Sequence, residues 1–185
     1  MNRREFLTKG LGFVAVGAAG ILLPDLAAAS DRNFWYRDRW VDIRRAQTGE
    51  RMKITFFESG RYLPEAYQQL CYMMRDVADR DKTSSIDFGV FNLMYGIQGW
   101  ARDAGVANPL ISVNSGYRTR THNNNLEGAA KNSLHVQGMA ADISVRGLNP
   151  EQVGKMAGYY AIGGVGFYGT FTHIDTGRVR QWRGG

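Results

Sequence analysis

Two short segments decide the fold of this chain: residues 133–142 read SLHVQGMAAD, and residues 171–177 read FTHIDTG. Both are rich in the residue types that bind metals or move protons. Side chains at positions i and i+2 of a strand lie on the same face of a sheet. If the second segment begins with a strand, His173 and Asp175 therefore point in the same direction. That segment would offer an imidazole and a carboxylate side by side.

The first segment supplies two more side chains of this kind. Ala140 and Asp142 share a face of a second strand by the same rule, and the small Ala140 leaves space beside the carboxylate. His135 lies far enough upstream for a loop to fold it over Asp142. Together with His173, these side chains would make a three-ligand zinc site with an open fourth position, the catalytic rather than the structural pattern. Spacing alone leaves an alternative open, because such spacings often occur by chance and a strand histidine can be an ordinary core or surface residue.

Composition narrows the class of protein. The chain has 185 residues, of which 44% are hydrophobic and 22% charged, as in one ordinary globular domain. Its single cysteine, Cys71, excludes an intrachain disulfide and a cysteine-based zinc site, and only three histidines are available for catalysis or metal binding. These counts exclude a zinc finger, a multi-pass membrane protein and a long repeat array. The net charge of +6 suits an anionic partner, although no nucleic-acid motif is visible.

The N-terminus has the pattern of an export signal. Residues 3–7 read RREFL, which is typical of a twin-arginine signal. Residues 10–23 form an apolar run that is shorter than the roughly 20 residues of a membrane-spanning helix, and residues 27–29 (AAA) offer a cleavage site. We therefore divide the chain into a signal peptide over residues 1–29 and a folded domain over residues 30–185, which is exported to the periplasm. The alternative is that the segment stays as an uncleaved membrane anchor.

The rest of the chain alternates between strand and helix patterns. A hairpin is expected from residues 40–44 and 52–57, and helices are expected to begin at Pro64, at Ser84 or Ser85, and at Asn149–Pro150. Further strands are expected over residues 110–113, 140–145, 163–168 and 171–175, with the glycines of the third requiring a close backbone approach. This order predicts an α+β fold in which a small antiparallel sheet bears the zinc site and packs against helices.

Four motifs in this order resemble those of a known family. Residues 133–142 have the form S-x-H-x-x-G-x-A-x-D, which resembles the first zinc signature of the D-alanyl-D-alanine metallopeptidases. This family belongs to the superfamily of lysostaphin, D-Ala-D-Ala peptidases and the hedgehog domain. The segments SGYR (115–118), GVGFY (164–168) and HIDTG (173–177) resemble further family segments. Within the family, the chain is most similar to the YcbK-like murein endopeptidases, over residues 48–182.

The resemblance implies that His135, Asp142 and His173 bind one zinc ion. Many D-Ala-D-Ala peptidases also place a catalytic Glu or Asp three residues before the last zinc histidine. Here that residue is Thr170, which cannot act as a carboxylate base. Asp175 is the natural substitute, and we predict it to be the general base that activates the zinc water. The competing interpretation is that Asp175 orients a ligand histidine.

The resemblance also assigns residues to substrate binding. Arg118 matches the family arginine, which binds the substrate carbonyl or a neighbouring carboxylate, and a fixed guanidinium beside zinc can stabilise an oxyanion. Tyr117 and Ser133 are the other substrate-binding candidates. Arg120 is expected to face solvent, and His122 to line the cleft or lie at a helix end rather than to bind metal.

These features predict an exported zinc-dependent murein peptidase that hydrolyses amide bonds in peptidoglycan stem peptides or cross-links. We expect a monomer that binds no nucleic acid and is not inserted in the membrane once its signal is removed. Two alternatives stay open. One is a D,D-carboxypeptidase with the same chemistry, and the other is a catalytically silent zinc-containing peptidoglycan-binding module, which the threonine at position 170 keeps possible.

Overall fold

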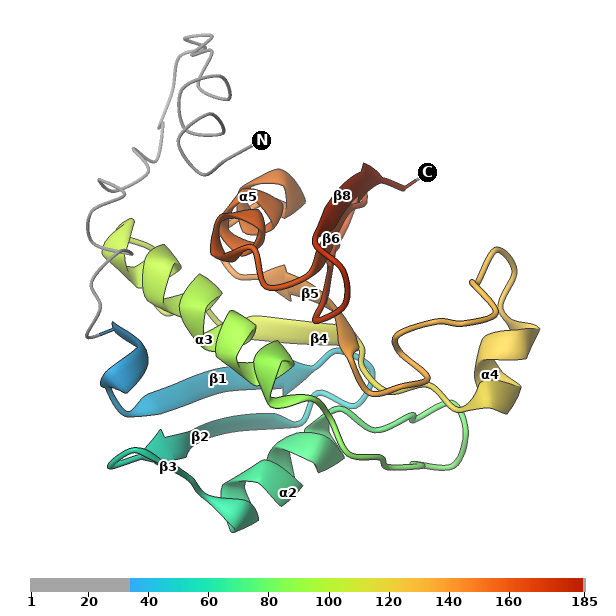
Figure 1. The fold of residues 1–185 in the computed structure, drawn as a ribbon, viewed down its shortest axis with the longest axis horizontal. Coiled ribbons are helices and arrows are strands. Elements are labelled where there is room, and N and C mark those ends of the chain that lie inside the picture. The colour runs from blue at the N-terminus through green and yellow to red at the C-terminus, as the bar shows by residue number, and fades with distance from the viewer. Residues whose placement is uncertain (1–33, 185) are drawn as a thin grey trace, which may run out of the picture.

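The computed structural model describes residues 34–184, in which a single mixed sheet packs against helices (Figure 1). The expected signal peptide, residues 1–29, lies outside the described residues. The strands are β1 (Arg39–Arg45), β2 (Arg51–Glu58), β3 (Arg61–Tyr62), β4 (Ile111–Ser115), β5 (Ala140–Val145), β6 (Gly164–Phe167), β7 (Thr172–Asp175) and β8 (Arg180–Arg183). The helices are the 3-10 turn η1 (Phe34–Tyr36), α2 (Pro64–Met73), α3 (Phe88–Asp103), α4 (Arg120–Asn125) and α5 (Pro150–Tyr160).

The sheet is larger and more mixed than the expected small antiparallel one. Its eight strands follow the order β3-β2-β1-β4-β5-β7-β6-β8. Most neighbours are antiparallel, but β1 pairs with β4 in parallel and β6 pairs with β8 in parallel. The second of these pairs has a simple cause. One edge of β7 is already occupied by β5, so β8 adds to the free edge of β6, which runs in the same direction. The α+β class is confirmed, and the purely antiparallel sheet is wrong.

The first hairpin follows the hydrophobic alternation that predicted it. In β1 the side chains of Val41 and Ile43 are fully buried, whereas Arg44 on the other face is exposed. β1 pairs with β2 in antiparallel register, and Gly49 in the connecting turn has a φ of +76°, which favours glycine. This hairpin places the end of β1 beside β4.

The helices begin where local capping chemistry allows. α5 starts at Pro150 after Asn149, whose side chain accepts a hydrogen bond from the backbone of Gln152 in a reciprocal capping box, as expected. The cap of α3 differs from expectation. It is Asp87, which accepts from the backbone NH of Gly89, rather than Ser84 or Ser85. A carboxylate at this position also interacts favourably with the helix dipole.

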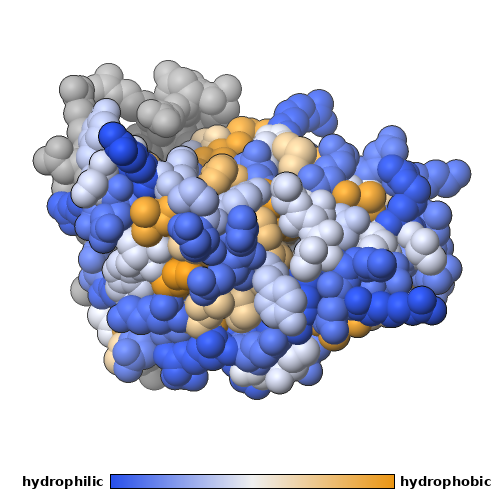
Figure 2. Space-filling model, turned by 90° about the horizontal axis from the view of Figure 1, so that it is seen from below, coloured by the Kyte–Doolittle hydropathy of each residue, from blue (hydrophilic) through white to orange (hydrophobic). Residues whose placement is uncertain are grey.

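The core lies between the sheet and the helices. α3 packs against β1, and α5 packs against β5, β6 and β7. Figure 1 shows α3 crossing in front of the sheet. Polar residues cover much of the face seen in Figure 2, with apolar ones in smaller patches. No helix within residues 34–184 is long and apolar enough to cross a bilayer.

The expected close approach at the glycine-rich strand is also found, because a Cβ at Gly163 would overlap the carbonyl oxygen of Asp175. This contact brings the end of β7 against β6.

Candidate metal centre

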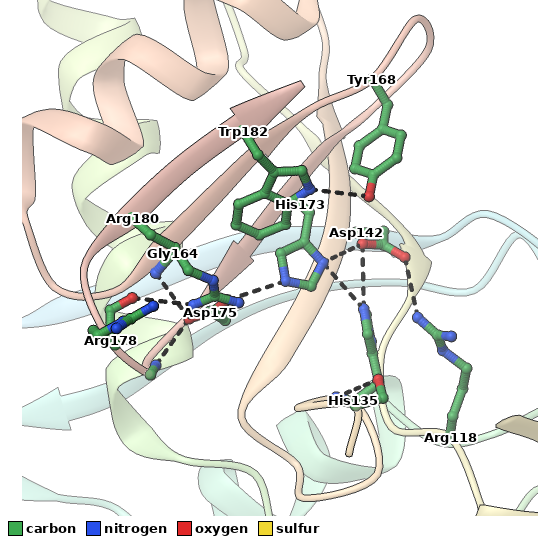
Figure 3. A network of polar contacts seen from close by, with 12 residues as sticks. Arg118, His135, Asp142, Gly164, Tyr168, His173, Asp175, Arg178, Arg180 and Trp182 are labelled. Atoms are coloured by element: carbon green, nitrogen blue, oxygen red, sulfur yellow. Dashed lines mark hydrogen bonds and ion pairs between the residues drawn. The ribbon is translucent and has the colours of Figure 1, made fainter. Parts of the chain in front are cut away.

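The structure brings His135, Asp142 and His173 together at one point of the sheet (Figure 3). Asp142 on β5 and His173 on β7 are directly paired across the two strands. Asp142 Oδ1 lies 2.8 Å from His173 Nδ1 and 3.3 Å from His135 Nε2, and the two nitrogens lie 3.2 Å apart. A tetrahedral ion with bonds of about 2.0–2.2 Å keeps its ligand atoms about 3.3 Å apart. The three side chains therefore need only a small separation of Asp142 from His173 to hold a metal ion.

The second nitrogen of each imidazole fixes which nitrogen faces the centre. His135 Nδ1 lies 2.7 Å from the carbonyl oxygen of Gly116, which can only accept a hydrogen bond, so Nδ1 carries the proton and Nε2 presents its lone pair. His173 uses the opposite arrangement, with Nε2 lying 3.2 Å from Asp175 Oδ2 and Nδ1 turned to the centre. Such partners orient metal-binding histidines and strengthen them as ligands.

Asp175 is enclosed by hydrogen-bond donors. Its side chain is fully buried, with 0% exposure, and Oδ1 accepts from the backbone NH groups of Gly164 at 2.8 Å and Gly177 at 2.9 Å. The Arg180 guanidinium donates to both oxygens, at 3.2 and 2.8 Å. Burial by itself would raise the pKa of Asp175, but the hydrogen bonds from His173, Gly164, Gly177 and Arg180 outweigh it and hold this pKa far below its usual range. The carboxylate is thus a stable anion next to His173.

The three central groups have different proton affinities. Burial would raise the pKa of Asp142, but hydrogen bonds to His135 and His173 outweigh it and hold this pKa far below its usual value. Burial lowers the pKa of His135. For His173, burial also acts to lower the pKa, but hydrogen bonds to Asp142 and Asp175 prevail and raise it. Asp142 is therefore ionised, and a proton is held most tightly by His173.

Arg118 lies beside this centre, as the resemblance implies. Its Nη2 lies 3.6 Å from Asp142 Oδ2, and Nη1 donates weakly to Asn123 Oδ1 at 3.4 Å. The other two predicted substrate-binding residues lie nearby. Ser133 is buried, and its Oγ accepts from the backbone NH of His135 at 3.3 Å, so this contact fixes the histidine turn. Tyr117 is half-buried and lines a pocket together with Arg118.

The remaining predicted residues lie outside the centre. Arg120 is exposed, as expected. His122 lies in the short helix α4 and forms a hydrogen bond with Asp76, with Nδ1 2.8 Å from Oδ1. Within residues 34–184, one cluster of three or more potential metal ligands is found, and it consists of His135, Asp142 and His173.

Three residues lie near the centre although the sequence patterns did not predict a role for them there. The Trp182 ring lies 5.2 Å from that of His173, and its Nε1 donates to the Tyr168 hydroxyl at 3.3 Å. Figure 3 shows that this hydroxyl points towards Asp142. The third is Arg180, which binds Asp175. The only available signal was the alternation of Arg180 and Trp182 in the last strand, which places both side chains on one face.

Comparisons with known proteins show the family of this chain. A family model described as peptidoglycan L,D-endopeptidase MepK matches residues 35–182. The protein of that name in Escherichia coli K12 is 37% identical over 187 residues, which cover 98% of this chain and 97% of the relative. A Haemophilus influenzae protein named "Probable peptidoglycan L,D-endopeptidase MepK" is 34% identical over 191 residues, with 99% and 96% covered. The resemblance to the YcbK-like murein endopeptidases is thereby confirmed, and the chain belongs to the MepK family of peptidases.

Proposed function

We propose that this chain is an exported, zinc-dependent murein endopeptidase that hydrolyses L,D cross-links between peptidoglycan stem peptides. The observation that carries the proposal is the triangle of His135 Nε2, Asp142 Oδ1 and His173 Nδ1, with sides of 2.8 to 3.3 Å. Two imidazoles and one carboxylate suit zinc, whereas calcium and magnesium prefer oxygen ligands. The names of the relatives supply the L,D specificity.

The ligand set leaves room for catalysis. A zinc ion with three protein ligands and an open position lowers the pKa of a water to about 7 and polarises a carbonyl. Arg118, close to Asp142, is placed to hold the scissile carbonyl and to stabilise the negative charge that develops on its oxygen. The Tyr168 hydroxyl accepts a hydrogen bond from Trp182, so its own proton is available to the same oxygen or to the leaving amine.

Asp175 could be the general base or a residue that orients His173, and its contacts support the second role. A general base must reach the water and hold its proton. Asp175 is fully buried, receives hydrogen bonds from Gly164, Gly177 and Arg180, and has a strongly lowered pKa. Each of these features disfavours proton uptake. We therefore propose that Asp175 orients His173, and that an acidified water makes a strong carboxylate base less necessary, consistent with a threonine at position 170.

The N-terminal sequence supports a location for the protein. The twin-arginine pattern over residues 1–29 supports export to the periplasm, where peptidoglycan lies. A protein without disulfides needs no oxidising environment to fold, so it can be exported already folded and loaded with metal. We propose that the mature protein is a monomer that binds neither nucleic acid nor membrane.

The test is digestion of purified cross-linked muropeptides, with and without a metal chelator, followed by mass analysis. Cleavage of L,D-linked dimers to monomers, lost with chelator and restored by zinc, is the expected result. Release of a single terminal D-alanine would instead identify a carboxypeptidase. Zinc binding without any product would identify a silent binding module.

A further inference from the structure

A pocket of about 190 Å³ lies next to the metal centre. It adjoins the centre through Arg118, which contacts Asp142 on one side and lines the pocket on the other. Arg45, His122 and the carboxylate of Asp76 also line it, together with the apolar side chains of Val77 and Ala78. Three nitrogen-bearing side chains from β1, α4 and the segment before α4 therefore meet around a single space. None of the roles proposed so far uses Arg45 or His122.

Arg45 is an unusual residue for its position. It follows Val41 and Ile43 on the buried face of β1, where an apolar side chain would be expected, and it is only 3% exposed. Within residues 34–184 its guanidinium makes a single hydrogen bond, from Nη1 to the carbonyl oxygen of Met73 at 3.3 Å, and its buried Nε has no partner. Burying a guanidinium with so few partners is costly. The position is explained if an anion completes its hydrogen bonds.

Arg118 has the same deficiency. Its Nε is buried and has no hydrogen-bond partner among the described residues. Its nearest carboxylate, Asp142, lies at 3.6 Å and would share its charge with a bound metal ion. Burial lowers the pKa of both Arg45 and Arg118, and the carboxylate of Asp76, which acts on both, offsets only part of this effect. Two under-compensated cations thus line one pocket.

His122 presents a ring nitrogen to the same space. Its Nδ1 lies 2.8 and 2.9 Å from the two oxygens of Asp76, a carboxylate that is only 1% exposed. Asp76 also accepts from the backbone NH groups of Thr119 at 2.8 Å and Asp79 at 3.3 Å, so its oxygens are occupied. The buried carboxylate fixes the imidazole ring, and Nε2, which makes no hydrogen bond within residues 34–184, is left for a ligand.

We propose that this pocket is a subsite for a carboxylate group of the peptide substrate, bound by Arg45 and Arg118. Because His122 Nδ1 donates to Asp76, its Nε2 is an acceptor and takes a hydrogen bond from an N–H group of the same peptide. A guanidinium pairs well with a carboxylate through charge-assisted hydrogen bonds, and Val77 and Ala78 can contact the aliphatic chain that carries it. The inference rests on the proposed function, because it takes the ligand to be a stem peptide. It deepens that function by requiring a free carboxylate close to the scissile amide.

The first experiment measures binding, so that its result does not depend on cleavage. Uncross-linked muropeptides, which carry the carboxylates but not the scissile cross-link, are titrated into the metal-loaded full chain by calorimetry. Their carboxylates are either free or amidated. Amidation is expected to weaken binding by about 10-fold to 100-fold, the range for lost hydrogen bonds to charged groups. Equal affinity for the two ligands would overturn the proposal.

Variants show whether this pocket is responsible. In Arg45→Gln the ratio between the two affinities should fall towards one, whereas His122→Gln should weaken the binding of both ligands alike. The matched control is Arg44→Gln, which removes the same charge from the exposed face of the same strand and should keep the full ratio. Circular dichroism checks that Arg45→Gln is folded, and Arg118→Gln gives a second variant if it is not. A full ratio in a folded arginine variant would contradict the assignment.

Cleavage separates this inference from the proposed function. If the chain prefers the free carboxylates but cleaves no cross-linked muropeptide with zinc bound, the subsite stands and the endopeptidase activity fails. If the chain cleaves cross-links but does not distinguish free from amidated carboxylates, the activity stands and the subsite fails.

Discussion

Asp142 and His173 are direct neighbours across β5 and β7, and the carboxylate Oδ1 of one lies 2.8 Å from Nδ1 of the other. Two of the three proposed metal ligands are thus positioned by backbone pairing rather than by a loop. A shift of one residue between these strands would turn one side chain to the opposite face of the sheet. The sheet therefore holds Asp142 and His173 in place, whereas His135 comes from the turn before β5.

Replacement of His173 by alanine should abolish metal binding. The change removes one of three ligands and leaves the carboxylate of Asp142 with a single imidazole partner, His135. Zinc content of the purified variant, measured by elemental analysis, should fall to background, and cleavage of cross-linked muropeptides should be lost. His122→Ala is the control for zinc content, because His122 lies outside the centre. Normal zinc content in His173→Ala would refute the ligand set.

Asp175→Asn distinguishes positioning from base catalysis. An amide cannot offer two anionic oxygens to Arg180 and His173, so the imidazole would lose the partner that fixes its orientation. If Asp175 orients His173, zinc affinity should fall about 10-fold to 100-fold, as measured by competition with a chelating dye. If Asp175 is instead the base, the variant should bind zinc normally and still fail to cleave.

Much of the local structure could be predicted from the sequence, because it depends on neighbours in the chain. Alternation of buried and exposed residues indicated the first hairpin, and Asn149 followed by a proline indicated the start of α5. The shared face of His173 and Asp175 is also local, and these two side chains do lie 3.2 Å apart.

What could not be predicted depends on contacts between distant segments. The parallel pairs β1–β4 and β6–β8 arise from the free edges that remain after other strands have paired. The burial of Asp175 depends on Arg180 and on the backbone of Gly164, which no pattern within the HIDTG segment reveals. The sequence therefore predicted three side chains that the structure brings together, but it left the role of Asp175 open.

Zinc affinity should decrease as the pH falls. Metal ligands bind in their deprotonated form, so a proton on His173 competes with the ion. The pKa of His173 is raised, so this competition begins at a higher pH than for an ordinary histidine. Asp142, whose pKa is lowered, stays ionised and adds no pH dependence near neutrality.

The measurement is a zinc titration at several pH values between about 8 and 5. Affinity should be highest at the alkaline end and should fall by about tenfold for each pH unit below the pKa of His173, with about one proton released per zinc bound. An affinity that stays constant over this range would show that His173 carries no proton in the metal-free protein.

Tyr168→Phe should slow the reaction without affecting the metal. Trp182 Nε1 donates to the Tyr168 hydroxyl, so the phenolic proton is not used in that bond and can be donated to the substrate. Phenylalanine keeps the ring, which stacks on Phe171 at 4.5 Å, and removes only the hydroxyl. Because a donor that acts on a developing negative charge contributes mainly in the transition state, we expect kcat to fall by about tenfold or more while KM changes little. Zinc content should match the unmodified protein. A variant with unchanged kcat would show that the hydroxyl serves only to hold Trp182 against His173.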